Sequence, residues 1–519
     1  MNGAEALMQT LCDGGVEVCF ANPGTSEMQL VAAIDKQKKM RAILGLFEGV
    51  VTGAADGYGR MTDKPAVTLL HLGPGLANGL ANLHNAKRAR TPLINIVGDH
   101  AVDHLKYNAP LTSDIIGVAS PMSDWVRTSK SPSDLATAGA EAIAISQSYP
   151  GSICTVIAPG DHAWGSNAVI APQIKVSTPK TISDEDISDA AQKLLGAEYP
   201  ALFLGSRALR KDALHHAGRI AAKINARIIC ETLPARLQRG EGVVPIERLP
   251  YFAESAVEFL KGLTHITFIG APPPVAFFAY PDKPGWLSPE GAELLELASP
   301  NIDAEDTLKR LADAMDAPNT PEKIQTKEIF DYEEGELNRD NAAMITANLL
   351  PENAIVSDES GTSGGSFFRY TASASFHDWL IITGGSIGQG LPVAVGAAVA
   401  HPSRKVVSLQ ADGSGMYTLQ ALWTMARENL DIVVIIMKNN SYGILNIELD
   451  RVGVKNPGEK ALSLLDLSNP IIDWLALAKG MGVRAHAAST TDEFSNYLQE
   501  ALNTKAVSYT HLRAHETRF

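Results

Sequence analysis

The sequence predicts an α/β protein whose sheets are mainly parallel and covered by helices on both faces. Short apolar runs alternate with helix-like stretches along the whole chain, and nearly every position of each run is apolar. Strands of this kind are typical of parallel sheets that are buried on both sides. The predicted strands are residues 66–70, 93–97, 153–157, 201–204, 266–269, 406–409 and 432–437.

Two segments rich in proline, serine and charged residues divide the chain into three units of comparable length. They are residues 166–184 and 303–327. Exposed linkers of this composition are typical of domain boundaries. The predicted domains are therefore 1–165, 185–302 and 328–506.

The last residues, 507–519, read VSYTHLRAHETRF and differ from the rest of the chain. They are polar and basic where an apolar strand would be expected to close the last sheet. We expect a disordered end or a foreign sequence here, and we assign it no function.

Composition excludes several classes of function. The chain has 519 residues, 45% hydrophobic and 20% charged, with a formal net charge of −14, which argues against nucleic acid as a partner. Its four cysteines form no Cys-x-x-Cys pair, so we expect a reducing, cytoplasmic setting without disulfides or structural zinc. The N-terminus does not resemble a signal peptide, and no apolar run is long enough to span a membrane.

A polar turn after one predicted strand and an amide after the next suggest a binding site. Asp412, Gly413 and Ser414 follow the first strand, and Asn439 follows the second, 27 residues later (439 − 412). A single predicted helix fills the gap, so both strand ends should meet at one edge of the sheet. Alone, the turn would suit an ordinary N-cap. Paired with an amide, it offers hard oxygen ligands for Mg²⁺ and a helix N-terminus for a phosphate.

This stretch resembles the diphosphate-binding motif of thiamine diphosphate (ThDP) enzymes. The resemblance implies that Asp412 and Asn439 bind magnesium, with the carbonyl of Ser441 as a third ligand. Asn440 competes with Asn439, but the spacing favours the earlier residue. The sequence departs from the family at Ala411, where glycine is usual.

Three glycines at a spacing of four, Gly49, Gly53 and Gly57, share one face of a predicted helix. Each costs roughly 1 kcal/mol relative to alanine inside a helix, so we expect another helix to pack closely against this face. Glu48 precedes them beside Phe47. A carboxyl group in an apolar crevice holds its proton more readily than one in water. By resemblance, Glu48 is the family glutamate that hydrogen-bonds the aminopyrimidine ring of the coenzyme.

A glycine-rich stretch, GGSIGQGLP at 384–392, precedes another predicted helix. Its spacing is not that of a dinucleotide-binding loop. By resemblance, Ile387 supports the bent coenzyme and the carbonyl of Gly385 accepts from its amino group. The upstream ESGTS resembles the loop near the diphosphate, with Gly361 as the contact. Tight packing between loop and helix is the structural alternative for both stretches.

The resemblance covers almost the whole chain and implies three doubly wound domains: an N-terminal pyrimidine-binding domain, a middle domain, and a C-terminal diphosphate-binding domain. In this family the coenzyme lies between the first domain of one subunit and the third domain of another. A homodimer or homotetramer is therefore expected.

The loop ANPGTSE at 21–27 and the segment LLHLGPG at 69–75 contain the candidate residues for contact with the substrate. By resemblance to benzoylformate decarboxylases and acetolactate synthases, Thr25 is a polar residue near the substrate. His71 resembles a proton relay, and histidine side chains titrate near neutral pH. A lone histidine at a strand end is more often structural, and it is the resemblance that brings the functional interpretation level with the structural one.

Other positions depart from both patterns. Leu111 stands where acetolactate synthases have glutamine, and the middle loop GAPPPVAFFAYP has Phe277 and Phe278 where benzoylformate decarboxylases have a catalytic histidine. We expect these two phenylalanines to pack under a proline-stiffened loop in preference to lining a pocket. The paired histidines of pyruvate decarboxylases are absent, because His100 and His104 are separated by three residues.

Over its whole length, and especially in the stretch NSYGILNIELDRVG at 440–453, the sequence most resembles acetolactate synthase large subunits. This implies decarboxylation of a small 2-oxo acid with ThDP and Mg²⁺, followed by carboligation. Plain decarboxylation is the alternative, because Leu111 leaves ligation open. FAD would fit the acetolactate synthase pattern, but no flavin motif supports it. A flavin- or NAD-linked oxidoreductase and a silent ThDP-binding paralogue are the hypotheses from other classes.

Overall fold

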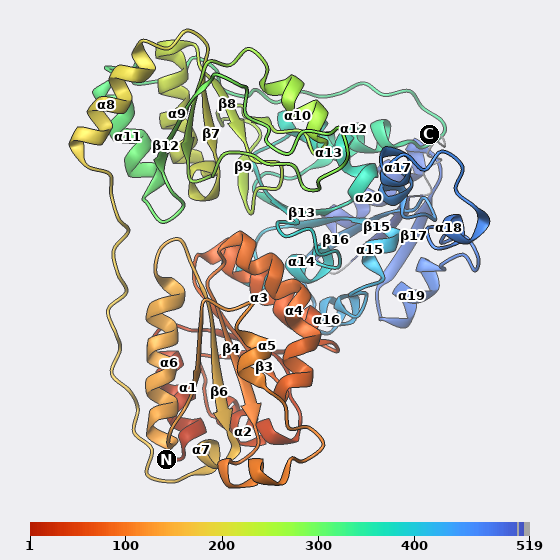
Figure 1. The fold of residues 1–519 in the computed structure, drawn as a ribbon. Helices are drawn as coiled ribbons and strands as arrows, with labels where there is room; N and C mark the ends of the chain where they lie inside the picture. The colour runs from red at the N-terminus through yellow and green to blue at the C-terminus, as the bar shows by residue number, and fades with distance from the viewer. Residues whose placement is uncertain (506–507, 513–519) are drawn as a thin grey trace.

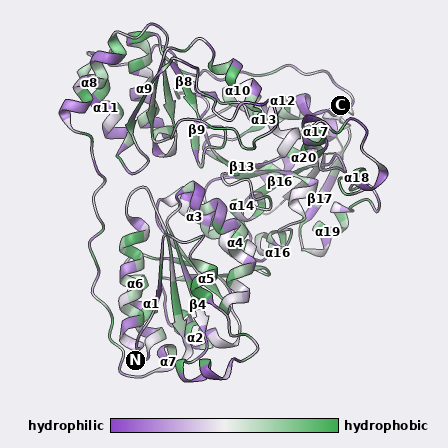
Figure 2. Ribbon diagram, viewed as in Figure 1, coloured by the Kyte–Doolittle hydropathy of each residue, from purple (hydrophilic) through white to green (hydrophobic). Residues whose placement is uncertain are grey.

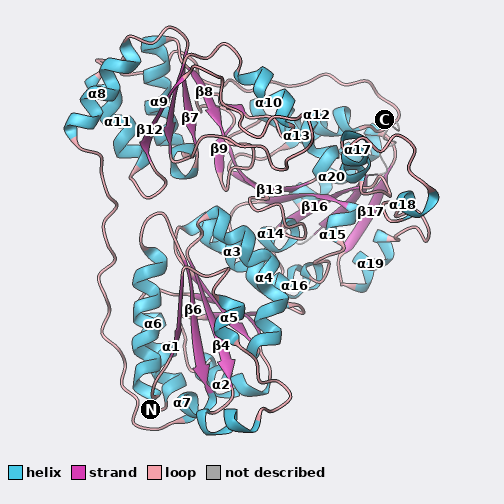
Figure 3. Cartoon of the chain, in the orientation of Figure 1, coloured by secondary structure: helices cyan, strands magenta, loops and turns pink. Residues whose placement is uncertain are grey.

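The computed structural model describes residues 1–505 and 508–512, and it describes side chains up to residue 505. The chain forms three sheets, each flanked by helices (Figures 1 and 3). Hydrophobic residues concentrate on the strands and on the helix faces turned toward them (Figure 2). All seven predicted strands are present, and the predicted α/β class with parallel sheets is confirmed.

The first sheet is parallel throughout, in the order β2-β1-β3-β4-β6-β5. Its strands are β1 (Val18–Asn22), β2 (Arg41–Leu44), β3 (Ala66–Leu70), β4 (Leu93–Asp99), β5 (Trp125–Thr128) and β6 (Ile153–Pro159). Helices cover both faces: α1 (Gly3–Asp13), α2 (Met28–Asp35), α6 (Pro132–Gln147) and α7 (Gly160–Trp164) on one, α3 (Glu48–Thr62) and α4 (Leu72–Ala89) on the other. The strand ends of β4 and β6 point away from the third sheet (Figure 3).

The middle sheet is also parallel, in the order β10-β8-β7-β11-β12. Its strands are β7 (Pro200–Leu204), β8 (Arg227–Cys230), β10 (Glu247–Arg248), β11 (His265–Ile269) and β12 (Glu293–Ala298). Around it lie α8 (Asp184–Leu195), α9 (Lys211–Ile224), α10 (Ala253–Leu260) and α11 (Ala304–Ala314).

The third sheet runs in the order β17-β18-β16-β15-β13-β14-β9 in the described part of the chain. Its strands are β9 (Leu237–Arg239), β13 (Ala354–Glu359), β14 (His377–Ile381), β15 (Val406–Ala411), β16 (Ile432–Met437), β17 (Arg484–Ala488) and β18 (Ser508–Leu512). β9 belongs to the middle stretch of sequence, yet it pairs antiparallel with β14. The middle part of the chain therefore contributes a strand to the third sheet and is held to it by backbone hydrogen bonds.

The remaining elements connect or cover the third sheet and the loops. They are α5 (Ile115–Ala119), α12 (Arg339–Leu349), α13 (Gly365–Tyr370), α14 (Gly390–Ala400), α15 (Asp412–Gly415), α16 (Ala421–Arg427), α17 (Gly443–Arg451), α18 (Glu459–Ser463), α19 (Trp474–Gly480), α20 (Thr491–Asn503), and the 3-10 turns η1 (Thr25–Glu27), η2 (Val102–Tyr107), η3 (Ser206–Leu209), η4 (Gly361–Gly364) and η5 (Thr371–Ser373).

The glycine stripe of α3 packs against α14, which joins the first and third parts of the chain. A Cβ added at Gly57 would lie 2.2 Å from the carbonyl oxygen of Val393, and one at Gly53 would lie 2.6 Å from Pro392. The expected close approach of a second helix is confirmed at these two positions. Gly49 instead meets the ring of Phe47.

Two segments differ from the sequence-based expectations. The second expected linker, 303–327, begins with α11, because Leu308 and Leu311 bury one helix face in the middle core. The expectation of a disordered end is wrong for Ser508–Leu512, which forms β18 between β16 and β17, whereas a foreign origin of the tail stays a prediction. Residues 507 and 513–519 of that tail lie outside the described residues. In the described part of the chain, no helix is both long and apolar enough to cross a bilayer.

Candidate functional site

Asp412 and Asn439 follow neighbouring parallel strands and come together at one edge of the third sheet. β15 pairs with β16 up to Ala411 opposite Met437, so the next residues of both strands leave the sheet side by side. The Asp412 carboxylate accepts from the N–H of Gly413 at 2.9 Å and from the N–H of Asn440 at 2.7 Å. The predicted meeting of the turn and the second strand end is therefore present in the fold.

The charge on Asp412 makes this edge suited to a cation. Its side chain is 2% exposed, and burial raises the pKa of Asp412 to about 6 although Asn440, Gly413 and Lys438 oppose that rise. A buried carboxyl group with so high a pKa lacks sufficient positive charge around it. A hard divalent ion would supply that charge, and carboxylate, amide and carbonyl oxygens are the ligands it prefers.

The loop after β16 presents further oxygen atoms. Asn439 Oδ1 accepts from the N–H of Ser441 at 3.0 Å, which holds the amide in a tight turn. Asn440 has a left-handed backbone, with φ of 54°, and its buried Oδ1 has no hydrogen-bond partner among the described residues. The backbone N–H groups of Asn439 and Asn440 face the Asp412 carboxylate, so both residues lie beside it. The donor set at this edge fits Mg²⁺.

The remaining residues expected to face the diphosphate lie around the same edge. Gly413 and Ser414 form the short helix α15, and Ser414 Oγ already accepts from Gln410 at 2.5 Å. Gly361 opens η4 after β13, the strand next to β15. The structure thus brings these three residues together with Asp412.

The glycine-rich loop before α14 is held from both sides. Asn85 Nδ2 donates to the carbonyl of Ser386 at 2.7 Å, and Thr418 donates to the carbonyl of Gly388 at 2.8 Å. Glu359 accepts from the N–H of Gly388 and from that of Gly390, each at 2.6 Å. Gly385 and Ile387 are therefore carried by a loop that side chains fix along its length.

A second group of residues lies at the carboxyl edge of the first sheet. His71 Nδ1 lies 2.8 Å from Glu27 Oε2 and 3.1 Å from Ser26 Oγ. Glu27 is fully buried, while the side chain of His71 is 22% exposed. The carboxylate orients the ring through Nδ1, and Nε2 remains for other contacts. Thr25 lies exposed on the same turn, and no hydrogen bond joins it to His71 in the described part of the chain.

Glu48 begins α3 and adjoins the histidine. It is half-buried, and its Oε2 accepts from Asn78 Nδ2 at 3.0 Å. A Cβ added at Gly75 would lie 3.3 Å both from Glu48 Oε1 and from the Cβ of His71, so the two side chains border one glycine. The described contacts of Glu48 are with α4 and do not include the Asp412 edge of the same chain.

Comparison with known proteins decides the family. Two family models match: the N-terminal TPP binding domain of thiamine pyrophosphate enzymes over residues 1–118, and their C-terminal TPP binding domain over 359–512. A Mycobacterium tuberculosis protein provisionally named acetolactate synthase large subunit IlvX is 49% identical over 502 residues, which cover 96% of each chain. The chain belongs to the thiamine pyrophosphate enzyme family.

Other members of the thiamine pyrophosphate enzyme family carry decarboxylase names. A benzoylformate decarboxylase of Pseudomonas aeruginosa is 28% identical over 517 residues, covering 94% of each chain. A solved structure, the ThDP-dependent 4-hydroxybenzoylformate decarboxylase of Rhodococcus jostii RHA1, superposes with a TM-score of 0.87 at 25% identity and covers 100% of both chains. The family resemblance and the fold expected from the sequence are confirmed.

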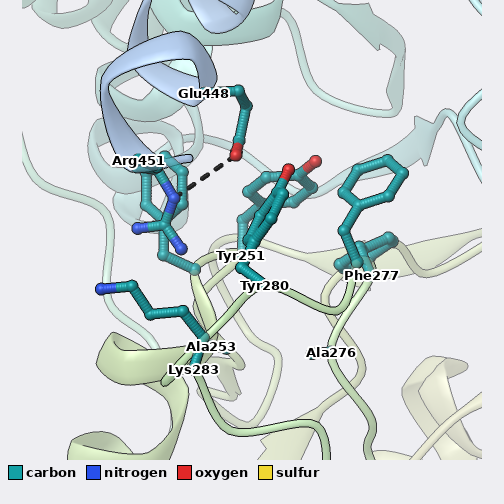
Figure 4. A pocket seen from close by; sticks show the side chains of 10 residues that line it. Tyr251, Ala253, Ala276, Phe277, Tyr280, Lys283, Glu448 and Arg451 are labelled. Atoms are coloured by element: carbon teal, nitrogen blue, oxygen red, sulfur yellow. Dashed lines mark ion pairs between the residues drawn. The ribbon is translucent and has the colours of Figure 1, made fainter. Parts of the chain in front are cut away.

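A pocket of this family member lies between the middle loop and α17, which begins at the Asn439 loop. It is a shallow hollow open to solvent, and Figure 4 shows Glu448 and Arg451 facing the aromatic rings. Phe277 and Phe278 line it and are 45% and 57% exposed, so the expectation that they pack under the loop is wrong. The Phe277 ring stacks on the ring of Tyr251, with centroids 4.7 Å apart, and so faces the pocket instead of packing under its own loop.

Sequence reasoning missed two buried carboxylates, Glu27 and Glu359. Glu27 stands in the loop ANPGTSE, which follows β1, and His71 follows β3. Because β1 and β3 are neighbours in the sheet, a correct prediction of that pairing would have brought Glu27 close to His71. Glu359 stands in the quoted ESGTS, but nothing local indicates its partners, which are 29 and 31 residues away.

Proposed function

We propose that this protein is a ThDP- and Mg²⁺-dependent enzyme of the acetolactate synthase type. It decarboxylates a small 2-oxo acid and joins the product to a second carbonyl compound. The observation that carries the coenzyme assignment is the buried Asp412 beside the Asn439 loop, on neighbouring strand ends. The name of the relative that is 49% identical supports the acetolactate synthase type.

The residues that we propose to bind the coenzyme and its metal lie at the carboxyl edge of the third sheet. Asp412, Asn439 and the carbonyl of Ser441 hold Mg²⁺. The diphosphate contacts are Gly361, Gly413 and Ser414, and the ring contacts are Gly385 and Ile387. When bound, ThDP would supply a nucleophilic carbon for the carbonyl of the 2-oxo acid and a thiazolium ring that takes up the electron pair left by CO₂.

The first sheet supplies the groups that handle protons. Glu48 presents a half-buried carboxyl group, which can share a proton with a ring nitrogen. His71 Nε2 can hold or deliver a proton to a substrate, since Glu27 holds the opposite ring nitrogen at 2.8 Å. Thr25, on the same turn, is proposed as a polar contact of the substrate.

We propose that a second copy of the chain completes each site, in a homodimer or homotetramer. The contacts of Glu48 do not reach the Asp412 edge within the described chain, and β4 and β6 point away from the third sheet (Figure 3). Exposed apolar side chains follow β4 on this edge: Val102, Leu105, Tyr107, Leu111 and Ile116. Residues 1–165, 185–302 and 328–506 would serve as the pyrimidine, middle and diphosphate domains. Sedimentation of the purified protein tests the assembly.

Decarboxylation without ligation is the second candidate, and the His71–Glu27 pair is the observation that favours it. An oriented histidine at the substrate side can protonate a carbanion before a second carbonyl arrives. The two routes begin alike and differ in the last step. Their products therefore separate them.

The decisive experiment incubates the protein with ThDP, Mg²⁺ and a panel of aliphatic and aromatic 2-oxo acids. Release of CO₂ and the identity of the organic product are measured together. Acetolactate from pyruvate supports the main proposal, and aldehyde alone supports the second candidate. The matched control is Glu48→Gln, which should lose turnover and keep binding of ThDP.

The same preparation tests the other classes. A flavin absorbance band would favour an oxidoreductase, and FAD would then have to be added to the coenzymes. Binding of ThDP without CO₂ release from any 2-oxo acid would favour a silent paralogue.

A further inference from the structure

Glu359 is a buried carboxylate whose partners belong to two separate loops. It ends β13 and is 5% exposed. Its Oε1 accepts from the N–H of Gly388 at 2.6 Å, and its Oε2 accepts from the N–H of Gly390 at 2.6 Å and from Gln410 Nε2 at 3.2 Å. All of these donors are neutral amides.

The backbone donors belong to the first residues of α14 and the loop before it. α14 begins at Gly390, and its N-cap residue, Gln389, makes no side-chain cap. The first N–H groups of a helix need an acceptor, and the helix dipole favours a negative one. Glu359 supplies both, so the anion position at this helix end is filled from within the chain. The glycine-rich loop is thereby unlike a phosphate-binding loop.

The side-chain amide of Gln410 connects Glu359 to the turn of Asp412–Ser414, the proposed diphosphate contact. Gln410 is fully buried at the end of β15, and its Nε2 also donates to Ser414 Oγ at 2.5 Å. Ser414 Oγ lies 3.4 Å from the backbone carbonyl of Glu359. Two buried side chains, Glu359 and Gln410, thus connect the Gly388–Gly390 backbone with the turn that contains Asp412.

The opposite side of the loop is held by other residues. Asn82 donates to the carbonyl of Gly388 at 3.3 Å, and Arg60 donates to Gln389 Oε1 at 3.1 Å. These contacts remain if the carboxylate is removed, so the loop should stay folded but lose its fixed position relative to β15. Burial raises the pKa of Glu359 while the N–H groups oppose the rise, so its negative charge depends on those donors.

We propose that Glu359 is a positioning residue that fixes the loop of Gly385 and Ile387 relative to the Asp412 turn. It sets the spacing between the ring-binding and diphosphate-binding halves of the ThDP site. The inference rests on the proposed function, because it concerns the same coenzyme. Glu359 acts through Gly388, Gly390 and Gln410, without touching the coenzyme.

The test compares two probes of the apo-protein in the presence of Mg²⁺. ThDP needs both halves of the site, whereas inorganic pyrophosphate needs only the Asp412 half. Glu359→Gln replaces one acceptor oxygen with an amide NH2 group, which can only donate and therefore faces a backbone N–H that has lost its acceptor. We expect it to weaken ThDP binding by about tenfold or more and pyrophosphate binding by less than about threefold, measured by titration calorimetry. Near-UV circular dichroism of bound ThDP should change as well.

The matched control is Asp358→Asn. Asp358 is the preceding residue of β13, is equally buried, and accepts from the N–H of Ser360 at 3.1 Å, away from the Gly388 loop. We expect it to lower stability and to leave the ratio of the two affinities unchanged. If Glu359→Gln fails to fold, Gln410→Met breaks the same connection from the other side and should shift the ratio in the same direction.

Three results would overturn the inference. The first is wild-type ThDP affinity in both Glu359→Gln and Gln410→Met. The second is equal weakening of ThDP and pyrophosphate binding in these variants. The third is the same shift of the ThDP-to-pyrophosphate affinity ratio in Asp358→Asn. A wild-type protein that binds no ThDP would instead contradict the proposed function itself. The two failures are therefore distinguishable.

Discussion

At the residue scale, three buried carboxylates determine the chemistry of the two groups of candidate residues, at the carboxyl edges of the first and third sheets. Glu27, Glu359 and Asp412 are at most 5% exposed. A buried charge is costly unless it is paired or hydrogen-bonded, and each of the three meets different partners. Glu27 orients a histidine, Glu359 holds a helix N-terminus, and Asp412 is short of positive charge. Only the last is suited to a metal ion.

The pairing of Glu27 with His71 predicts an effect on turnover. Glu27→Gln replaces the negative charge and one acceptor oxygen with an amide NH2 group, so the carboxylate that holds His71 Nδ1 at 2.8 Å is lost and the ring loses its fixed orientation. We expect kcat to fall by about tenfold or more, with binding of ThDP unchanged. Steady-state kinetics on the best 2-oxo acid measures the change.

Ser26→Ala is the control for that variant. It removes the 3.1 Å contact to His71 and keeps the carboxylate, so the loss should be smaller. A wild-type rate in Glu27→Gln would mean that His71 has no part in proton transfer.

At the scale of elements, the contact between α3 and α14 positions the site. Gly53 and Gly57 let α14 lie directly on α3, and Gly396 of α14 faces α3 in return, where an added Cβ would lie 1.9 Å from the carbonyl oxygen of Ala54. The same α14 begins at the loop that Glu359 holds. The packing of α14 on α3 therefore also fixes the position of the proposed coenzyme loop, from which α14 begins.

This contact predicts that Gly57→Ala is destabilising. Its Cβ would lie 2.2 Å from the backbone of Val393, and backbone cannot move away as a flexible side chain can. We expect a loss of about 1–3 kcal/mol in the free energy of unfolding, measured by denaturant titration.

Gly480→Ala is the matched control. Gly480 ends α19, is exposed, and has nothing within 4 Å of an added Cβ. Alanine there should leave stability unchanged or raise it by about 0.5–1 kcal/mol. Equal losses in both variants would contradict close packing as the cause.

At the scale of the whole molecule, one aspartate joins the three parts of the chain. Asp378 on β14 is fully buried and accepts from Arg236 Nε and from Arg404, each at 2.5 Å. Arg236, from the middle part, also donates to the carbonyls of Arg60 and Met61 in α3. The network fixes how the first and middle parts sit on the third sheet.

The network predicts that Asp378→Asn is strongly destabilising at neutral pH. Burial alone would raise the pKa of Asp378, but Arg236 and Arg404 hold it below its ordinary value. Removing one member of a buried ion pair costs about 3–5 kcal/mol, because two guanidinium groups lose their counter-charge. Thermal and denaturant unfolding measure the loss.

The pH dependence of that loss has a definite sign. A carboxyl group whose pKa is lower in the folded state stabilises the fold above its unfolded pKa, and this stabilisation disappears as pH falls through the folded value. The difference between wild type and Asp378→Asn should therefore shrink in acid. Asp184→Asn, whose partner is Arg310 and whose side chain is 98% exposed, is the control and should cost less than about 1 kcal/mol at any pH.

By itself, the sequence determined the α/β class, the main strands and the thiamine pyrophosphate family. Apolar runs encode buried strands locally, and the strand–helix–strand rule brings Asp412 and Asn439 to one edge whatever the rest of the chain does. Those features depend on short stretches of chain, which is why they could be predicted.

The tertiary structure alone decided the partners of the buried charges. Glu27 meets His71 across 44 residues, Glu359 meets Gly388 across 29, and β9, from the middle part of the chain, pairs with β14 in the third sheet. It also placed Phe277 on a pocket and Ser508–Leu512 in the third sheet. Such contacts depend on how loops and sheets pack against one another, and no periodicity along the chain records that packing.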